Sequence, residues 1–324
     1  DIFLVIRKSD NRARHIGVVA YVNEGVALRD AGITAPILVL HPQSISFKTL
    51  IDRCLEPSIY STHVLDEFIK ITKAQSQKDY PVHIKFNTGL NRLGFKVNDI
   101  DSIVSKLDNT SSIKVNSLFS HLVASEDANE LDFSNNQIEK FKTIAATFEE
   151  KSGIKPWLHM CNTSGIINYP EAHFDMVRSG IGLYGFGNSI EEDNKLKPIA
   201  SLKSVISQIH TIEKDETVGY NRAYTAKGIE KTATIPIGHA DGISRIYGQE
   251  KGFVTINSEK APIIGNVCMD MIMVNITNID CKEGDEVIIF DNKYKANTLA
   301  EAANTISYEI MTSISQRVKR VFIP

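Results

Sequence analysis

The chain has 324 residues and a formal net charge of −3 at pH 7. This length suits two domains with separate cores, and the weak negative charge argues against nucleic acid or a membrane surface as a partner. No apolar run approaches the roughly 18–20 residues of a membrane-spanning helix, and no signal peptide opens the chain, so we expect a cytoplasmic protein. The four cysteines lie far apart without a CxxC pair, which indicates free thiols and no metal site.

The first half of the chain alternates short apolar runs with longer amphipathic stretches. Helices are predicted at stretches such as Asn23–Ala31 and Gln137–Lys151, with eight strands between such stretches. This alternation predicts an α/β fold in which residues 1–195 form a (β/α)8 TIM barrel, whose chemistry lies at the C-terminal ends of its strands. The predicted strands are Phe3–Ile6, Ile16–Ala20, Ile37–Leu40, Tyr60–Val64, Val82–Phe86, Val115–His121, Trp157–Met160 and Asp175–Arg178.

After about residue 195 the pattern becomes β-rich, with little helix between the strands. Residues 196–324 are therefore predicted to form a separate C-terminal β-rich domain, with one helical pattern at Thr298–Thr312. Its strands are predicted within Ala200–Thr211, Thr232–Pro236, Lys251–Asn257, Ala261–Gly265, Met271–Ile276 and Asp285–Phe290.

One interval does not suit a parallel barrel. Only nine residues separate Ile6 from Ile16, whereas a parallel crossover with its helix takes at least about 10–12 residues and usually more. Either the first strand is not a barrel strand, or a strand–helix segment is absent between these residues. We expect the second.

Two cations follow one predicted strand. Lys85 lies near the end of Val82–Phe86, and Arg92 lies in the polar turn after it. Like charges repel unless an anion lies between them, so the spacing fits either an anion at this strand end or a solvated edge strand with two unrelated cations. Because His121, His159 and Arg178 also fall at or just past predicted strand ends, a site at the C-terminal end of the barrel is favoured.

Ordered motifs along the chain resemble those of the bacterial alanine racemases, a pyridoxal-phosphate-dependent family of fold type III with a (β/α)8 barrel and a C-terminal β domain. The resemblance extends from about residue 16 to Pro324. Any one motif alone would be weak, but their order and intervals make the signal specific. The motifs are His83–Phe95, Ser120–Ser125, His159–Gly165, Met176–Gly185, Val218–Arg222, Ile237–Gly242, Gly265–Asp270 and Ile306–Glu309.

The resemblance implies an enzyme that interconverts L- and D-alanine as a homodimer and supplies D-alanine for cell-wall peptidoglycan. Racemisation needs the α-proton removed from one face and returned on the other, so two bases and an electron sink serve it best. In the family the sink is pyridoxal phosphate, held as a Schiff base by a lysine at the end of the first barrel strand. The second base is a tyrosine of the partner subunit, to which Tyr220 corresponds.

The resemblance also assigns residues to the cofactor. Arg178 corresponds to the arginine that faces the pyridine nitrogen, His159 to the residue that orients this arginine, and His121, grouped with the catalytic residues, to the residue packed against the ring. Hydrogen-bonded core histidines are the alternative interpretation of His121 and His159. The residues implied to hold or support the phosphate are Asn162, Thr163, Gly180, Ile181 and Tyr308.

Substrate contacts and one modification follow from the same resemblance. Arg92 corresponds to an arginine that reaches the cofactor and the substrate carboxylate, and Met269 to a residue whose backbone N–H binds that carboxylate. Tyr220 and Met269 would complete the site of the partner subunit. Lys85 corresponds to a lysine that carbon dioxide often carbamylates, and the resulting carboxylate would be the anion that the two cations require.

The sequence departs from the family pattern at three places. The cofactor lysine belongs to a Lys-x-x-x-Tyr-Gly-type segment after the first strand, but here Arg7 falls at its place and Lys8 one position later. Roughly 20 or more residues of the pattern are absent, judged from the length of a parallel crossover. His239 stands where tyrosine is usual, and Asn87 where aspartate is usual.

Two further functions fit the sequence. A broader racemase acting on serine or lysine is the nearest alternative, which pocket size around His239 and Tyr308 would distinguish. A non-catalytic pyridoxal-phosphate-binding barrel, or one domain of a larger fusion, follows if the cofactor lysine is truly absent. The retained Tyr220 and Met269 motifs speak against the second alternative.

Overall fold

The structure is a computed structural model that describes residues 3–7, 14–293 and 296–323. The chain forms two compact units. The first comprises residues 1–183 and 189–192, and the second comprises residues 184–188 and 193–324. Within the described residues, no helix combines the length and the apolar character needed to cross a membrane.

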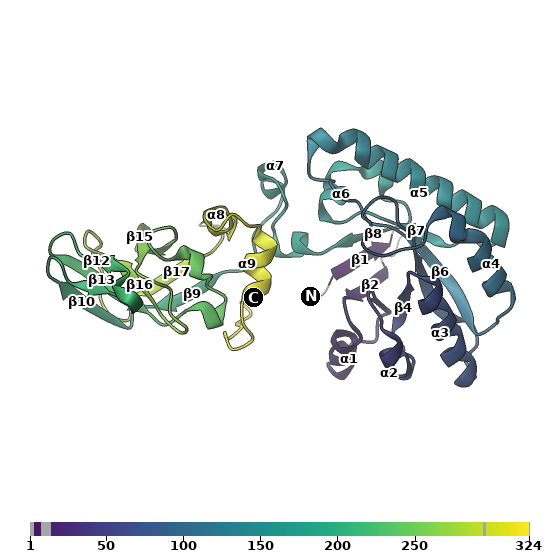
Figure 1. Ribbon diagram of the computed structural model, residues 1–324, viewed down its shortest axis with the longest axis horizontal. Coiled ribbons are helices and arrows are strands. Elements are labelled where there is room, and N and C mark those ends of the chain that lie inside the picture. The colour runs from purple at the N-terminus through teal and green to yellow at the C-terminus, as the bar shows by residue number, and fades with distance from the viewer. Residues whose placement is uncertain (1–2, 8–13, 294–295, 324) are drawn as a thin grey trace. The chain divides into compact units, whose positions relative to one another are not determined.

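The first unit contains a closed barrel whose eight strands follow one another in chain order (Figure 1). Strands β2 to β8 pair in parallel. This confirms the predicted barrel fold, with an exception at its first strand. The strands are β1 (Phe3–Arg7), β2 (Arg14–Val19), β3 (Ile37–Val39), β4 (Glu56–Ile59), β5 (Tyr80–Lys85), β6 (Ile113–Phe119), β7 (Trp157–His159) and β8 (Met176–Ser179).

Helices lie outside the strands of the barrel (Figure 1). Their apolar faces, including Leu50, Phe68, Phe141 and Phe148, are buried in the main core against the outward-facing side chains of the strands. Successive helices also contact one another, as α4 does α5. These helices are α1 (Val22–Asp30), α2 (Phe47–Asp52), α3 (Thr62–Ala74), α4 (Ile100–Asp108), α5 (Leu131–Ser152) and α6 (Thr163–Asn168), and the short α7 (Ile190–Asp193) follows β8 in the chain.

The first strand runs against the rest of the barrel. β1 pairs antiparallel with β2 and with β8, so it closes the barrel in the opposite direction from a (β/α)8 strand. The short interval explains this direction, because a few residues can join antiparallel neighbours but not parallel ones. One expectation is thereby corrected: β1 is a barrel strand, as predicted, but it is not a parallel one. Lys8 lies outside the described residues.

The fourth strand lies earlier than the sequence predicted. Residues 60–64 were expected as a strand for their aromatic and β-branched side chains, but α3 begins within them. The hydroxyl of Ser61 accepts a hydrogen bond from the backbone N–H of Val64, which caps the helix. The strand is instead Glu56–Ile59, in which Pro57 obscures the strand pattern.

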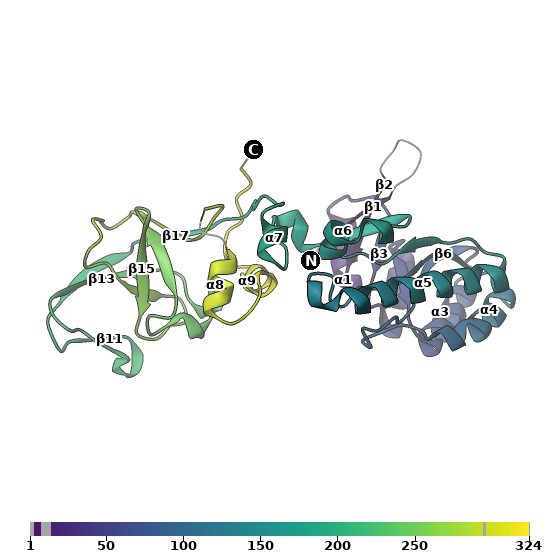
Figure 2. The same cartoon turned by 90° about the horizontal axis from the view of Figure 1, so that it is seen from above.

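The second unit is built on a seven-stranded antiparallel sheet in the order β10-β13-β16-β15-β14-β17-β9. It confirms the predicted C-terminal β domain, except that the expected helix over residues 298–312 is two short helices, α8 and α9 (Figure 2). The elements are β9 (Leu202–Val205), β10 (Gln208–Ile212), β11 (Thr217–Val218), β12 (Tyr224–Thr225), β13 (Glu230–Ile235), β14 (Phe253–Ile256), β15 (Glu259–Ile264), β16 (Ile272–Asn275), β17 (Glu286–Phe290), α8 (Ala296–Ala302) and α9 (Ser307–Ser313).

The interior of the barrel has an apolar side and a polar side. Ile16, Val18, Leu38 and Met176 form a small buried cluster from β2, β3 and β8, separate from the main core. Successive residues of a strand point to opposite faces, and the alternate residues Val19, Ile37 and Val39 belong to the main core under the helices. The polar side comes from β4 to β8 and includes His83, Ser117 and His159, all fully buried.

Candidate functional site

The turn after β5 fixes the position of Arg92. The Asn87 side-chain oxygen accepts hydrogen bonds from the backbone N–H groups of Gly89 and Asn91, and its amide nitrogen donates to the Asn91 side chain. Gly94 has a φ of 129°, and a Cβ there would lie 2.7 Å from the Asn87 backbone nitrogen. Only glycine therefore fits where the end of the turn passes the backbone at its start. Arg92 is exposed at the tip of the turn.

Lys85, the last residue of β5, is a buried cation beside other cations. Its side chain is 6% exposed, and its Nζ lies 5.7 Å from the centroid of the Phe119 ring. Burial, together with the charges of Arg178 and Arg92, lowers the pKa of Lys85 to about 8. Within the part of the chain that the structure describes, no carboxylate forms an ion pair with Lys85.

Arg178 on β8 is held by acceptors that carry no charge. One terminal nitrogen donates to Nδ1 of His159 at 2.6 Å. The other donates to the Ser120 carbonyl at 2.8 Å, to Nδ1 of His121 at 3.1 Å and to the Met160 carbonyl at 3.2 Å. Burial lowers the pKa of Arg178 to about 10, which still leaves a cation at neutral pH.

Both predicted histidines are neutral neighbours of this cation. The His159 ring stacks on Phe119 with centroids 4.9 Å apart, and the Arg178 guanidinium lies 5.4 Å from the same ring. Burial, and then the charge of Arg178, lowers the pKa of His159 and of His121 well below the ordinary value. Neutral rings can accept hydrogen bonds from the guanidinium, whereas imidazolium rings could not.

Thr163 binds the backbone that follows β8. Its hydroxyl oxygen accepts from the backbone N–H groups of Gly180 and Gly182, each at 3.3 Å. A Cβ at Gly182 would lie 2.7 Å from the Thr163 methyl group, so a small residue is required there. The cluster thus provides backbone donors and a hydroxyl at one place, which suits the oxygens of a phosphate.

Asn162 and Ile181 frame this cluster. Asn162 caps α6 by accepting from the Gly165 backbone N–H at 2.9 Å, and it also accepts from the Ser125 hydroxyl at 2.8 Å. Ile181 is buried directly after Gly180.

Tyr220 and Met269 belong to the second unit, where they lie on neighbouring loops. The Asn266 side chain donates to the Tyr220 carbonyl at 3.0 Å, and a Cβ at Gly265 would lie 2.8 Å from the Val218 carbonyl. Tyr220 is 74% exposed and Met269 is 59% exposed. Large apolar side chains left this open are consistent with a surface that another molecule covers.

The backbone around Met269 is fixed by the segment 238–242. The His239 N–H donates to the Cys268 carbonyl and the Ala240 N–H to the Met269 carbonyl, at 3.0 and 2.9 Å. His239, the departure from the family pattern, is exposed. Tyr308, on α9, accepts a hydrogen bond from Asn188 at 3.3 Å within the second unit.

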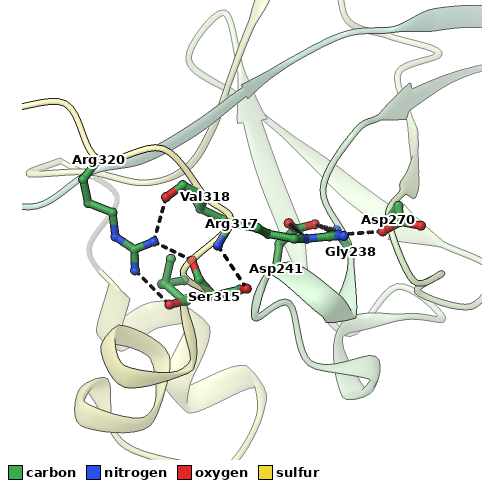
Figure 3. A network of polar contacts seen from close by, with 8 residues as sticks. Gly238, Asp241, Asp270, Ser315, Arg317, Val318 and Arg320 are labelled. Atoms are coloured by element: carbon green, nitrogen blue, oxygen red, sulfur yellow. Dashed lines mark hydrogen bonds and ion pairs between the residues drawn. The ribbon is translucent and has the colours of Figure 1, made fainter. Parts of the chain in front are cut away.

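Arg317 links the segment 238–242 to the loop that carries Met269 (Figure 3). Arg317 donates through Nε and a terminal nitrogen to both carboxylate oxygens of Asp241, at 2.7 and 3.0 Å, and to Asp270 at 2.6 Å. Asp241 in turn accepts from the Gly238 backbone N–H at 2.8 Å. Because Asp270 follows Met269, Arg317 joins the two loops that flank it.

The chain matches the family models for the alanine racemase N-terminal domain over residues 2–187 and C-terminal domain over residues 199–322. The chain belongs to the alanine racemase family. It is 36% identical to alanine racemase from Clostridium tetani over 94% of this chain and 81% of that protein, and 38% identical to alanine racemase 2 from Bacillus subtilis over 94% and 80%.

Solved alanine racemases share the fold. The structure from Clostridium difficile 630 in complex with cycloserine has a TM-score of 0.85 at 32% identity, covering 96% of this chain and 81% of that one. The structure from Bartonella henselae with covalently bound pyridoxal phosphate has a TM-score of 0.84 at 27% identity, covering 95% and 85%.

The structure therefore gathers several of the predicted alanine racemase residues within the first unit, whereas Tyr220, Met269 and Tyr308 belong to the second. Lys85, His121, His159 and Arg178 meet at one end of the barrel, near the loops that carry Arg92 and Thr163. Sequence reasoning missed the roles of Phe119, which reads as an ordinary core residue, and of the backbone carbonyls that hold Arg178. No side-chain pattern marks a carbonyl, so the missed carbonyls carried no signal.

Proposed function

We propose that this chain interconverts L- and D-alanine with pyridoxal phosphate as its cofactor. One observation supports it above all others. Lys85, Arg92 and Arg178 cluster at the C-terminal end of the barrel, and the described residues provide no carboxylate that pairs with them. Cations buried beside neutral histidines need anionic partners. A carbamate on Lys85, the phenolate of the cofactor and the substrate carboxylate would supply them.

The described residues fit the non-covalent part of the cofactor. The Thr163 hydroxyl and the amides of Gly180 and Ile181 would hold the phosphate, supported by Asn162. Only a small residue fits at Gly182 beside Thr163, as a loop that binds phosphate through its backbone requires. Bound there, the cofactor would supply an electron sink for the α-carbon of the substrate.

Arg178 would set the protonation of the cofactor ring. Its guanidinium stays charged at neutral pH even after burial lowers its pKa to about 10. A cation opposite the pyridine nitrogen disfavours a second positive charge on that nitrogen. His159 would hold the guanidinium in place, and His121 would pack beside the ring.

Tyr220 would move the proton on the second face of the substrate. A phenol titrates near 10 in water, so it needs neighbouring cations to act as a base near neutrality. Tyr220 is 74% exposed in its own unit, and we propose that it enters the site of a partner subunit in a homodimer. Met269 would accompany it and bind the substrate carboxylate, together with Arg92.

Lys85 would carry a carbamate. A neutral amine attacks the carbon of carbon dioxide, an N–C bond forms, a carbonyl electron pair moves to oxygen, and the nitrogen loses a proton to solvent. With a pKa of about 8, roughly a tenth of the Lys85 amines are neutral at pH 7. The carbamate would turn Lys85 from a cation into the anion that Arg92 and Arg178 require.

The covalent anchor of the cofactor separates this proposal from its alternative. Arg7, at the end of β1, pairs with Arg14 and Met176 at the starts of β2 and β8. The chain therefore leaves β1 at the end of the barrel away from Ser179, where the family lysine would be expected. This direction of β1 disfavours Lys8 as the covalent anchor, and the racemisation test below decides between a racemase and a barrel that only binds the cofactor.

Racemisation by the purified full chain tests the proposal. The chain is supplied with pyridoxal phosphate, and loss of optical activity is measured with L-alanine, L-serine and L-lysine. We expect alanine to react fastest, with deuterium incorporated at its α-carbon in heavy water. Pyridoxal-phosphate absorbance that stays with the protein after desalting, without deuterium exchange, would contradict racemisation and support a cofactor-binding barrel. Serine or lysine reacting as fast as alanine would indicate the broader racemase.

A further inference from the structure

A row of polar side chains crosses the barrel interior below the candidate site. Glu56 on β4, His83 on β5, Ser117 on β6 and His159 on β7 belong to four successive strands. Strand register places them on one ascending path, because His83 pairs with both Ser58 and Ser117, and His159 pairs with Phe119. The path begins at the first residue of β4 and ends at Arg178, near the end of β8.

Short hydrogen bonds connect every step of this row. The Glu56 carboxylate lies 2.7 Å from Nε2 of His83, and Nδ1 of His83 lies 2.6 Å from the Ser117 hydroxyl. That hydroxyl lies 3.0 Å from Nε2 of His159, whose Nδ1 lies 2.6 Å from Arg178. Both histidines and Ser117 are fully buried, and the Glu56 side chain is 14% exposed.

The two ends of the row determine where each hydrogen lies. A guanidinium can only donate, so Nδ1 of His159 must accept from Arg178 and the hydrogen of this neutral ring lies on Nε2. Nε2 therefore donates to Ser117, the Ser117 hydroxyl donates to Nδ1 of His83, and Nε2 of His83 donates to Glu56. All four bonds point the same way, from the cation to the carboxylate.

The opposite charge state of His83 does not fit this row. A protonated His83 would donate to Ser117 from Nδ1 while His159 donates from Nε2. The hydroxyl hydrogen of Ser117 would then have no acceptor among the residues that the structure describes. A buried donor without an acceptor is costly, so the one-directional arrangement is the satisfied one.

We infer that Glu56 is a positioning residue for Arg178, acting through His83, Ser117 and His159 by fixing which nitrogen of His159 carries the hydrogen. The inference rests on the proposed function, since the orientation of Arg178 matters to the reaction only if it faces the cofactor. Without the row, His159 could place its hydrogen on Nδ1 and turn a donor toward the guanidinium. Two facing donors would push the guanidinium out of place.

The test measures the hydrogen positions directly. Nitrogen NMR of histidine-labelled full chain, without added cofactor, distinguishes protonated from unprotonated ring nitrogens. The variants His83→Asn and His159→Asn identify the signals of these two rings by their loss. We expect Nδ1 unprotonated and Nε2 protonated in both rings. In Ser117→Ala the His83 and His159 signals should shift or average between tautomers, and kcat for alanine should fall about tenfold, the effect of one hydrogen bond in a charged network, with KM changed less than about twofold.

Two further variants separate positioning from packing. Glu56→Ala removes the final acceptor and should behave like Ser117→Ala, whereas Glu56→Gln keeps an acceptor oxygen and should retain most of kcat. Ser58→Ala is the matched control, because Ser58 is fully buried on the same strand as Glu56 and its hydroxyl has no hydrogen-bond partner among the described residues. It should leave the histidine signals and kcat unchanged.

Several outcomes would overturn the inference. Unchanged His159 signals and unchanged kcat in Ser117→Ala and Glu56→Ala would do so, as would a lower thermal midpoint with both readouts unchanged. A Nδ1-protonated His159 in the unaltered chain would contradict the direction of the row. Fixed tautomers in a chain that does not racemise alanine would contradict the proposed function and leave the hydrogen-bond row supported.

Discussion

Arg178 and Arg317 show two different uses of one residue type. Arg178 is buried, its pKa is lowered, and its acceptors are neutral ring nitrogens and carbonyls. Arg317 is exposed, and the hydrogen bonds that it donates to Asp241 and Asp270 raise its pKa. Burying a cation costs free energy unless an anion pairs with it, so Arg178 calls for an anionic ligand. Arg317 already pairs with two carboxylates of the protein and needs no ligand. The contrast therefore separates a ligand site from a structural support.

The largest predicted effect is that of replacing Tyr220, the proposed base for the α-proton of the substrate. Tyr220→Phe removes the phenolic hydroxyl, and we expect racemisation to fall by about 10²–10⁴, the contribution of a positioned acid–base group. Because Tyr220 is exposed in its unit, the thermal midpoint should not change. Cofactor absorbance should also be retained. Activity above about a tenth of the original would exclude Tyr220 as a base.

Replacing Lys85 should separate function from stability. Lys85→Met should lower activity about tenfold by removing the carbamate. At pH 7 its free energy of unfolding should exceed that of the original chain without carbamate by about 1–3 kcal/mol. The folded pKa of about 8 lies below the unfolded value of 10.5. Burial of charged Lys85 therefore lowers the stability of the original chain by its full amount below pH 8. This loss is relieved as pH rises from 8 to 10.5.

Denaturant titrations at pH 7 and pH 10, on protein freed of carbon dioxide, measure this difference. Lys203→Met is the matched control, because Lys203 pairs with Glu286 at an exposed position and should change stability little. Greater stabilisation by Lys85→Met at pH 10 than at pH 7 would contradict the assigned pKa. Mass spectrometry of the untreated chain should show Lys85 heavier by one carbon dioxide, more so at pH 9 than at pH 6.

Removing the paired arginine should have a smaller and different effect. Arg317→Ala breaks the link between the two loops that flank Met269, so we expect KM for alanine to rise about fivefold with kcat changed less. Arg320→Ala is the control, since Arg320 donates to carbonyls of its own segment, at Ile314, Ser315 and Val318. If both variants change KM equally, Arg317 acts by ordering the C-terminal segment and not by linking the two loops.

The smallest predicted effect is that of Asn87→Asp. The carboxylate can still accept from the Gly89 and Asn91 N–H groups but loses the donor to the Asn91 side chain. Activity should stay within about twofold. The added negative charge should raise the pKa of Lys85 and reduce its carbamylated fraction, which carbon NMR with labelled carbon dioxide would detect. An unchanged fraction would contradict this and show that the turn holds the side chain at residue 87 away from Lys85.

Local signals predicted what lies within one strand and its turn. The Lys85 and Arg92 pair and the His159 segment could be found because strand ends and motifs are contiguous in sequence. The role of Glu56 could not be predicted, since its partner His83 is 27 residues away and their hydrogen bond depends on the register between strands. The strand predicted at 60–64 was wrong because one serine hydroxyl decides that a helix begins there.

The reversed first strand has a consequence for solubility. Seven parallel strands without β1 would form an open sheet whose outer strands, β2 and β8, each expose a row of unpaired backbone groups. Such edges recruit strands from other molecules. β1 pairs with both edges, through Phe3 to Arg7 on one side and Leu4 to Arg7 on the other. This five-residue strand therefore protects the barrel against edge-to-edge aggregation, whichever direction it runs.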